Sequence, residues 1–253
     1  MRNFKINRKG NTIRGKIYGD TSKKRSVIIL SHGFMANQKS CKAYAEFLAK
    51  AGFIAVTYDF CGGGLGSVSD GKTEEMTVFT EKEDLLSVIR TFEKQPYTKD
   101  ISLFGMSQGG FVSAMVAKEI PERIKKLILL FPALCIPDDA RKGQMMFYRF
   151  DPENIPDILG KRPMKLGGDY ARCVLKMDAS IEIGGFFGPV LYVHGTADRI
   201  VDISYARKGH TLYDNCDYHE IEGAGHGFRR KENILVKAWM LDFLLREEGE
   251  DFS

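Results

Sequence analysis

Gly105-Met106-Ser107-Gln108-Gly109 is the stretch of this sequence that decides the fold. It follows an apolar run, residues 101–104, and precedes a helix-like stretch, residues 111–119. A serine between two glycines, at a turn from a strand into a helix, has the layout of a nucleophile elbow. In that turn the serine hydroxyl stands clear of the sheet, and the glycines keep neighbouring groups from colliding. The motif therefore predicts that Ser107 is a covalent nucleophile.

Short apolar runs alternate with helical patterns on both sides of this motif. The predicted strands are residues 27–30, 53–58, 101–104, 127–130, 190–193 and 218–221. The main predicted helices are residues 43–50, 78–92, 111–119 and 234–246. Apolar strands between amphipathic helices indicate an α/β fold with a mostly parallel sheet covered on both faces. The opening segments, 3–6 and 12–18, are expected to form an antiparallel edge hairpin.

One region, residues 132–187, interrupts this alternation. It is rich in proline, holds no clear strand and lies between two predicted core strands. A loop of that length without structure of its own is uncommon. We therefore expect one domain, residues 1–253, with an insertion of short helices at about 132–187 that folds as a lid over the carboxyl edge of the sheet. The insertion's methionines and aromatic residues suit either an adaptable pocket wall or a small core of its own.

The composition is that of a soluble globular protein. Of the 253 residues, 43% are hydrophobic and 28% are charged, with a net charge of +4. No run approaches the roughly 18 apolar residues of a membrane span, and the first residues lack the apolar centre of a signal peptide. Five scattered cysteines, an odd number, favour reduced thiols and a cytoplasmic location.

Local context disfavours three other kinds of function. The basic clusters at 23–25 and 229–231 are short and lack interleaved aromatic residues, which indicates a solvated surface rather than nucleic-acid binding. Residues 66–73 match the Walker A pattern, but the preceding strand ends near Tyr58 and two glutamates follow Thr73. No C-x-x-C or H-E-x-x-H spacing occurs, so neither zinc nor another cofactor is expected.

A serine hydroxyl needs a base to take its proton and a third group to hold that base. With a nucleophile elbow the chain order is serine, acid, histidine. The segments after the last two predicted strands, His194-Gly195-Thr196-Ala197-Asp198 and Gly223-Ala224-Gly225-His226-Gly227, supply both partners. We expect His226 to be the general base and Asp198 the acid. Asp202 is the alternative acid, although it also fits the N-cap of a helix.

An oxyanion hole needs two backbone N–H groups directed at the developing negative charge. One is expected from Gln108, the residue after the nucleophile. The other is expected from Phe34, in the loop Ser31-His32-Gly33-Phe34 after the first core strand. Asp59 also ends a strand, but it precedes the serine in the chain, which favours a structural role.

These motifs together resemble those of the bacterial cinnamoyl (feruloyl) esterases of the α/β-hydrolase superfamily. The resemblance rests on His32-Gly33-Phe34, Asp59-Phe60, Ser69-Asp70-Gly71-Lys72, Gly105-Met106-Ser107-Gln108-Gly109-Gly110, His194-Gly195-Thr196-Ala197-Asp198 and Gly223-Ala224-Gly225-His226 and, in the insertion, on residues 150–157 and 166–170. It covers nearly the whole chain. It implies an α/β-hydrolase fold and hydrolysis of esters between hydroxycinnamic acids and sugars or simple alcohols, with the aromatic acyl group under the lid.

Two departures from that family bear on the substrate. Met106 stands where such esterases usually carry histidine, and Met146 occupies a lid position where some members place a polar residue. Both leave the catalytic residues intact and weaken the expected preference for hydroxylated cinnamates. We expect Asp139, Met146 and Tyr170 to contact the substrate, with a place in the first turn of a lid helix as the alternative for Asp139.

The prediction is thus a serine carboxylester hydrolase that acts, through an acyl-enzyme, on hydroxycinnamate or similar small aromatic or short-acyl esters. A monoacylglycerol lipase and a general short-chain carboxylesterase share the triad and stay open, as does a binding protein on the same fold. The expected partner is a small-molecule ester, with no nucleic acid and no membrane span, and a homodimer is left open.

Overall fold

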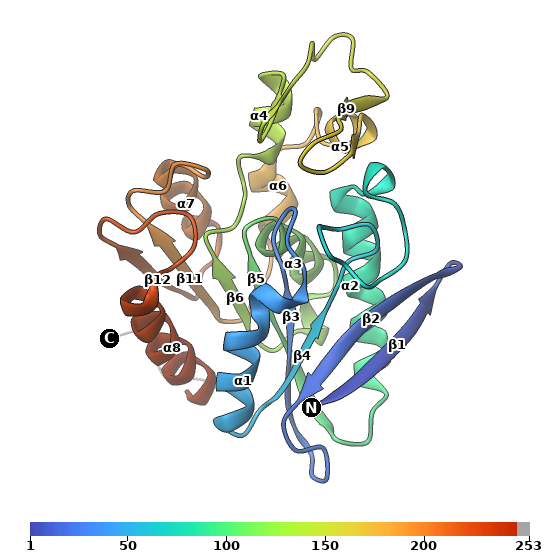
Figure 1. The fold of residues 1–253 in the computed structure, drawn as a ribbon. Coiled ribbons are helices and arrows are strands. Elements are labelled where there is room, and N and C mark those ends of the chain that lie inside the picture. The colour runs from blue at the N-terminus through green and yellow to red at the C-terminus, as the bar shows by residue number, and fades with distance from the viewer. Residues whose placement is uncertain (247–253) are drawn as a thin grey trace.

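The computed structural model describes residues 1–246, and residues 247–253 of the predicted domain lie outside the described part. An eight-stranded sheet in the order β1-β2-β4-β3-β5-β6-β11-β12 forms its centre (Figure 1). The strands are β1 (Arg2–Arg8), β2 (Asn11–Tyr18), β3 (Arg25–Ser31), β4 (Ile54–Tyr58), β5 (Thr98–Met106), β6 (Leu127–Leu130), β11 (Val190–Gly195) and β12 (Cys216–Ile221). From β4 to β12 every pairing is parallel, whereas β1 and β2 form an antiparallel edge. The predicted sheet and N-terminal hairpin are confirmed.

Helices cover both faces of this sheet. On one face lie α1 (Lys42–Lys50) and α8 (Arg230–Leu245), and on the other lie α2 (Val78–Glu93), α3 (Gln108–Glu119) and α7 (Ile203–Gly209). Successive side chains of a strand point to opposite faces. In β3, accordingly, Val27 and Ile29 pack in one core while Ile28 and Leu30 pack in the other. Burial on both faces explains why the core strands are continuous apolar runs in the sequence.

Between β6 and β11 the chain leaves the sheet. The insertion contains α4 (Ile136–Arg141), β7 (Gln144–Met145), β8 (Tyr148–Arg149), β9 (Ile158–Gly160), β10 (Leu166–Gly167), α5 (Asp169–Arg172) and α6 (Ala179–Ile183). The expectation that it lacks strands is wrong, because β7–β8 and β9–β10 form two small sheets. Strands of two or three residues are too short to show an alternating pattern. In Figure 1 α4, α5 and β9 lie beyond the carboxyl edge of the main sheet. Movement of this insertion as a lid stays a prediction.

Short 3-10 turns complete the connections, at Gln38–Cys41, Thr73–Glu75, Pro121–Arg123 and His210–Leu212. The helix after the nucleophile begins at Gln108, three residues earlier than the sequence pattern indicates. Within residues 1–246, no helix combines the length and the apolar character needed to cross a membrane.

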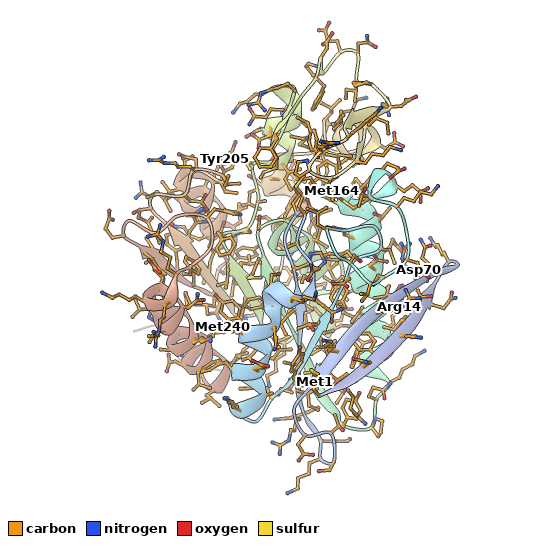
Figure 2. The ribbon with its side chains drawn as sticks, viewed as in Figure 1. Met1, Arg14, Asp70, Met164, Tyr205 and Met240 are labelled. Atoms are coloured by element: carbon orange, nitrogen blue, oxygen red, sulfur yellow. The ribbon has the colours of Figure 1, made fainter. Side chains whose placement is uncertain are left out.

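The segment that matches the Walker A pattern is fastened to the edge of the sheet. Asp70 accepts hydrogen bonds from the backbone N–H of Thr12, at 2.9 Å, and from the guanidinium of Arg14, at 2.5 Å (Figure 2). Nearby, Asp59 accepts from the N–H of Gln38 and of Val68 at 2.6 and 2.8 Å. Both carboxylates thus serve to shape the loop that follows β4.

Candidate active site

Ser107 lies at a strained turn between β5 and α3. Its φ of +51° is in a region that non-glycine residues rarely occupy, at a cost of about 1–3 kcal/mol. Its N–H donates to the carbonyl of Leu130 at 3.0 Å, which holds the turn against β6. A Cβ added at Gly109 would lie 2.3 Å from the carbonyl oxygen of His32, so only glycine fits there. The elbow predicted from the sequence is therefore present in the structure.

His226 and Asp198 approach this serine from the loops after β12 and β11. Nε2 of His226 lies 2.9 Å from Ser107 Oγ, and its Nδ1 lies 2.8 Å from Asp198 Oδ2. Both are hydrogen-bond distances, so the three side chains form one continuous chain. With an N–H on Nδ1 donating to the carboxylate, Nε2 is free to accept the serine proton. The structure thus brings the three predicted catalytic residues together.

The carboxylate of Asp198 is buried, with 6% of the residue exposed. Its Oδ1 accepts from the N–H groups of Ile200 and Val201 at 2.8 and 3.0 Å. Burial by itself raises the pKa of Asp198, but hydrogen bonds from His194, His226 and the Val201 N–H outweigh it and leave the pKa well below the usual range. Asp198 is therefore ionised at neutral pH and able to stabilise a protonated His226.

Two other polar residues near this acid, His194 and the alternative acid Asp202, have structural roles. His194 Nε2 is closer to the carbonyl of Val201, at 2.9 Å, than to Asp198 Oδ2, at 3.4 Å, so its proton points mainly to the carbonyl. Asp202 caps α7 and accepts from the N–H of Ser204 at 2.9 Å. Of the two candidate acids, only Asp198 contacts His226.

Phe34 and Gln108, the residues predicted for the oxyanion hole, line the same cavity as the nucleophile. A Cβ added at Gly33 would be 3.1 Å from Ser107 Cβ, so the loop after β3 passes close to the serine. Gln108 opens α3, where N–H groups have no partner inside the helix and the dipole favours negative charge. Within residues 1–246, neither N–H donates to a loop or side-chain acceptor. This arrangement is suited to binding an oxyanion.

The side chain of Gln108 is buried and held at both ends. Its Nε2 donates to Glu81 Oε2 at 2.7 Å, and its Oε1 accepts from the hydroxyl of Tyr170. The ring of Tyr170 also packs against the ring of Phe34, with centroids 5.6 Å apart. Tyr170, from the insertion, therefore contacts both residues of the expected oxyanion hole.

Glu81 is a site residue that the sequence reasoning missed. It lies on α2 with 1% of its surface exposed, and burial raises its pKa well above the usual range. Its spacing could have indicated that it is buried. Glu81 falls three residues after Val78 and four before Leu85, on the buried face of the helix. A carboxyl group on such a stripe needs a polar partner.

Two hollows meet at Ser107. The smaller, a cavity of about 40 Å³, faces the insertion and is lined by all three predicted substrate contacts, Asp139, Met146 and Tyr170. Asp139 lies in the first turn of α4, as its alternative placement expects, and its contact with the substrate stays a prediction. Burial raises the pKa of this carboxyl group. The larger hollow, a groove of about 360 Å³, includes His226 among its walls.

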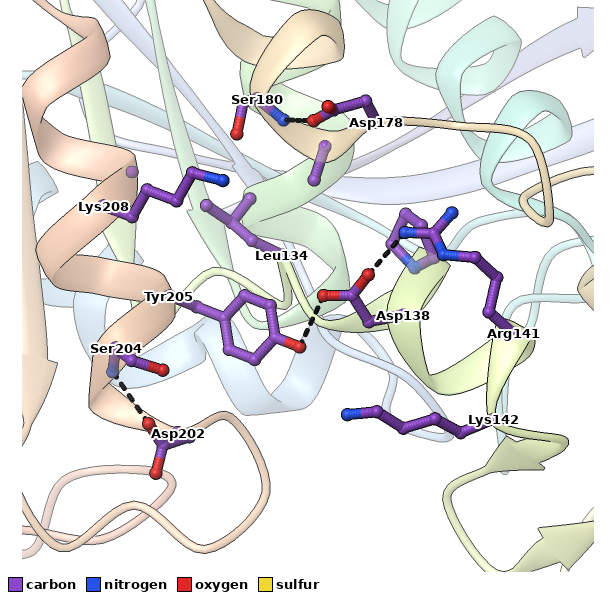
Figure 3. Close-up of a pocket in the computed structure, with 13 residues that line it drawn as sticks. Leu134, Asp138, Arg141, Lys142, Asp178, Ser180, Asp202, Ser204, Tyr205 and Lys208 are labelled. Atoms are coloured by element: carbon purple, nitrogen blue, oxygen red, sulfur yellow. Dashed lines mark hydrogen bonds and ion pairs between the residues drawn. The ribbon is translucent and has the colours of Figure 1, made fainter.

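A third hollow, of about 550 Å³, lies between the insertion and α7 (Figure 3). The hydroxyl of Tyr205 on α7 donates a hydrogen bond to the carboxylate of Asp138 on α4 at 2.8 Å, and Asp138 also forms an ion pair with Arg141. Among the described residues that line this hollow, none belongs to the candidate triad. We interpret these contacts as a connection between the insertion and α7.

A mostly parallel, doubly covered sheet, with an elbow serine, a buried acid and a histidine in this chain order, defines an α/β hydrolase. The sequence pattern of the Hydrolase_4 family, described as serine aminopeptidase, S33, matches residues 22–178, and the chain belongs to this family. The matched range contains Ser107 and ends before Asp198 and His226.

Solved structures and curated proteins are similar to this chain. Est1E from Butyrivibrio proteoclasticus, solved with ferulic acid bound, has a TM-score of 0.88 and 30% identity over 96% of this chain and 100% of its own. A monoacylglycerol lipase from Paleococcus ferrophilus, with a TM-score of 0.71 and 20% identity over 91% of this chain and 99% of its own, shares the fold. Putative esterase/lipase 2 of Mycoplasma genitalium is 30% identical over 123 residues, 48% of this chain and 44% of that protein. The chain spans less than half the length of the curated relatives it matches.

Proposed function

We propose that this protein is a serine carboxylester hydrolase that works through an acyl-enzyme. The observation that carries the proposal is the hydrogen-bonded chain from Ser107 Oγ through His226 to Asp198, with distances of 2.9 and 2.8 Å. A serine at a strained elbow, a base within reach and an ionised acid behind that base are the parts that acyl transfer needs.

The reaction begins when Ser107 Oγ attacks the ester carbonyl while His226 Nε2 takes the hydroxyl proton. The N–H groups of Phe34 and Gln108 donate to the oxyanion that forms. His226 then gives its proton to the alcohol oxygen, the bond from the acyl carbon to that oxygen breaks, and the acyl group stays on Ser107. Water, deprotonated by His226, then attacks the acyl carbon, the bond from that carbon to Ser107 Oγ breaks, and the proton on His226 returns to Oγ as the acid leaves. Asp198 stabilises the protonated histidine in both halves.

For the acyl group we propose a hydroxycinnamate or a similar small aromatic acid. Two observations support this choice: the similarity to Est1E, solved with ferulic acid, and the cavity lined by Asp139, Met146 and Tyr170 next to Ser107. In that cavity Met146 would contact the ring, and Asp139 would accept a hydrogen bond from a phenolic hydroxyl.

A short acyl chain is the second candidate, and one observation favours it. The cavity of about 40 Å³ is far below the roughly 300–1,000 Å³ of most small-molecule sites. As it stands, it accommodates a short acyl chain more readily than a feruloyl group. On this alternative the protein is a general short-chain carboxylesterase, and a long monoacylglycerol chain is the least favoured substrate.

Steady-state hydrolysis of methyl ferulate, p-nitrophenyl butyrate and a monoacylglycerol tests these proposals. Replacement of Ser107 by alanine is expected to lower turnover by about 10⁶, and a variant that keeps most of its activity contradicts a serine mechanism. Asp139→Asn tests the acyl group, with Asp138→Asn, outside the cavity, as the matched control. We expect Asp139→Asn to lower kcat/KM for ferulate more than for unsubstituted cinnamate, and equal losses contradict the phenolic contact.

We further propose that the protein acts in the cytoplasm on small-molecule esters. All five of its cysteines are free thiols, which supports a reducing compartment. Fractionation of the native cells tests the location, and sedimentation tests whether the protein forms the homodimer that the sequence leaves open.

A further inference from the structure

The chemistry of the reaction indicates which of the two hollows at Ser107 holds the acyl group of an ester and which holds the alcohol. The alcohol leaves with a proton from His226 Nε2, so its oxygen must lie within hydrogen-bond reach of that atom. His226 lines the groove of about 360 Å³ and, within the described residues, does not line the cavity of about 40 Å³. The alcohol therefore belongs in the groove and the acyl group in the cavity.

The walls of the groove are mainly apolar. Its larger side chains are those of Phe34, Tyr44, Met106, Phe131 and Phe228. Phe131 packs edge-on against both His226 and Phe228, with ring centroids 4.8 and 5.1 Å apart. The aromatic surface is thus continuous with the base that would protonate the alcohol. Met106, which departs from the histidine usual in cinnamoyl esterases, adds to this apolar surface.

The polar side chains of the groove already have partners. Ser40 Oγ donates to the carbonyl of Asn37 at 2.9 Å. Asn233 accepts from the hydroxyl of Tyr44 and donates to the carbonyl of Phe228 at 2.5 Å. Among the described residues, no Lys, Arg, Asp or Glu lines the groove. An alcohol rich in hydroxyls would find few free partners here, whereas an apolar alcohol gains by leaving water.

We propose that the groove is a subsite for an apolar alcohol, aryl or alkyl, of the ester substrate. The inference rests on the proposed serine ester hydrolase function and names the class of alcohol that leaves.

A subsite that holds the leaving alcohol must also bind an alcohol that attacks the acyl-enzyme, because that attack is the reverse of acylation. His226 Nε2 then takes the alcohol's proton, the alcohol oxygen bonds to the acyl carbon, the bond from that carbon to Ser107 Oγ breaks, and the proton returns to Oγ. A new ester and free enzyme result, with no change of oxidation state.

Partition of the acyl-enzyme between water and alcohol tests this proposal. The enzyme is acylated with p-nitrophenyl butyrate in the presence of equal concentrations of benzyl alcohol or glycerol, which both offer primary hydroxyls. Chromatography then measures butyric acid and the two possible butyrate esters. We expect at least about ten times more benzyl ester than glyceryl ester. Equal yields, or more glyceryl ester, overturn the proposal.

Matched variants test the location of the subsite. Met106→Gln changes the groove, and Met146→Gln makes the same substitution in the cavity. We expect the first to reduce the ratio of benzyl ester to butyric acid several-fold and the second to leave that ratio unchanged. The ratio reports only on folded, acylated enzyme, so a loss of stability does not affect it. Equal effects of the two variants on this ratio overturn the assignment. Phe228→Ala is a second groove variant, and we expect it to lower the ratio as Met106→Gln does.

Failure of this inference differs from failure of the proposed function. If Ser107→Ala releases p-nitrophenol as fast as the unaltered protein, the serine mechanism itself is wrong. If the protein forms and hydrolyses the acyl-enzyme but transfers no more butyrate to benzyl alcohol than to glycerol, only the apolar alcohol subsite is wrong.

Discussion

The hydroxyl of Tyr170 donates to Oε1 of Gln108, which lies 62 residues earlier in the chain and directly follows the candidate nucleophile. Both residues are buried, with 3% and 1% of their surfaces exposed. Since Glu81 holds the other end of the same amide, the side chain of Gln108 has one orientation. A residue of the insertion thereby fixes a residue of the expected oxyanion hole.

Replacing Tyr170 by phenylalanine tests this relationship. The variant leaves Gln108 Oε1 buried without a donor, which costs about 1–3 kcal/mol of unfolding free energy. We expect kcat for p-nitrophenyl butyrate to fall while KM changes less. Urea unfolding and steady-state kinetics measure both effects. Tyr97→Phe is the matched control, since the Tyr97 hydroxyl makes no hydrogen bond within residues 1–246, and a Tyr170 variant that behaves like it refutes the role.

The acid of the triad is tested by a pair of identical substitutions. Asp198→Asn removes the negative charge behind His226 and disturbs its tautomer, which lowers kcat by about 10⁴ in a serine triad. Asp202→Asn keeps an oxygen that can cap α7, so we expect activity close to that of the unaltered protein. Rates of p-nitrophenyl butyrate hydrolysis measure both. Similar losses in the two variants would contradict the assignment of Asp198.

Glu81 is expected to make stability depend on pH. Because burial raises its pKa, the folded state keeps a proton that the unfolded state releases. Its contribution is complete below the ordinary value of 4.5 and is lost as the pH rises through the raised value. Glu81→Gln retains an oxygen for Gln108 Nε2 and removes this titration.

Urea unfolding from about pH 5 to 9 checks that expectation. The unfolding free energy of Glu81→Gln should fall less with rising pH than that of the unaltered protein. Glu122→Gln, at an exposed position, is the control and should leave the slope unchanged. Parallel curves for all three proteins would show that Glu81 is ionised in the folded state.

The elbow tolerates no side chain at its second glycine. In Gly109→Ala the new Cβ would meet the backbone oxygen of His32 at 2.3 Å, and we expect a loss of at least about 1–3 kcal/mol. Gly225→Ala is the control, because its nearest neighbour would lie 3.9 Å away. Thermal unfolding compares the two, and equal melting temperatures would exclude crowding at the elbow.

The sheet and the triad were predictable because their signals are local. Ser107 and Asp198 each follow an apolar strand, His226 follows the more polar last strand, and parallel strands bring their carboxyl ends to one edge of a sheet. Chain order then assigned the roles without knowledge of any contact. The predicted substrate contacts also share one cavity, since Asp139, Met146 and Tyr170 all come from the insertion.

The remaining features depend on contacts between distant segments. The strands β7 to β10 are two or three residues long and owe their conformation to pairing rather than to pattern. Glu81 becomes a partner of Gln108 only when α2 and α3 pack together. The division of the site into a cavity and a groove likewise follows from where the insertion lies, which no short motif specifies.

The hydrogen bond between Ser107 and His226 joins residues 119 positions apart. During synthesis the ribosome therefore releases the elbow well before the histidine, and a domain that folds as a unit cannot complete its sheet until β12 has emerged. In the nascent chain Ser107 has no general base until β12 has joined the sheet and His226 lies beside it. Hydrolytic competence is thus acquired last, and the first turnover reports that the C-terminal part of the domain has docked.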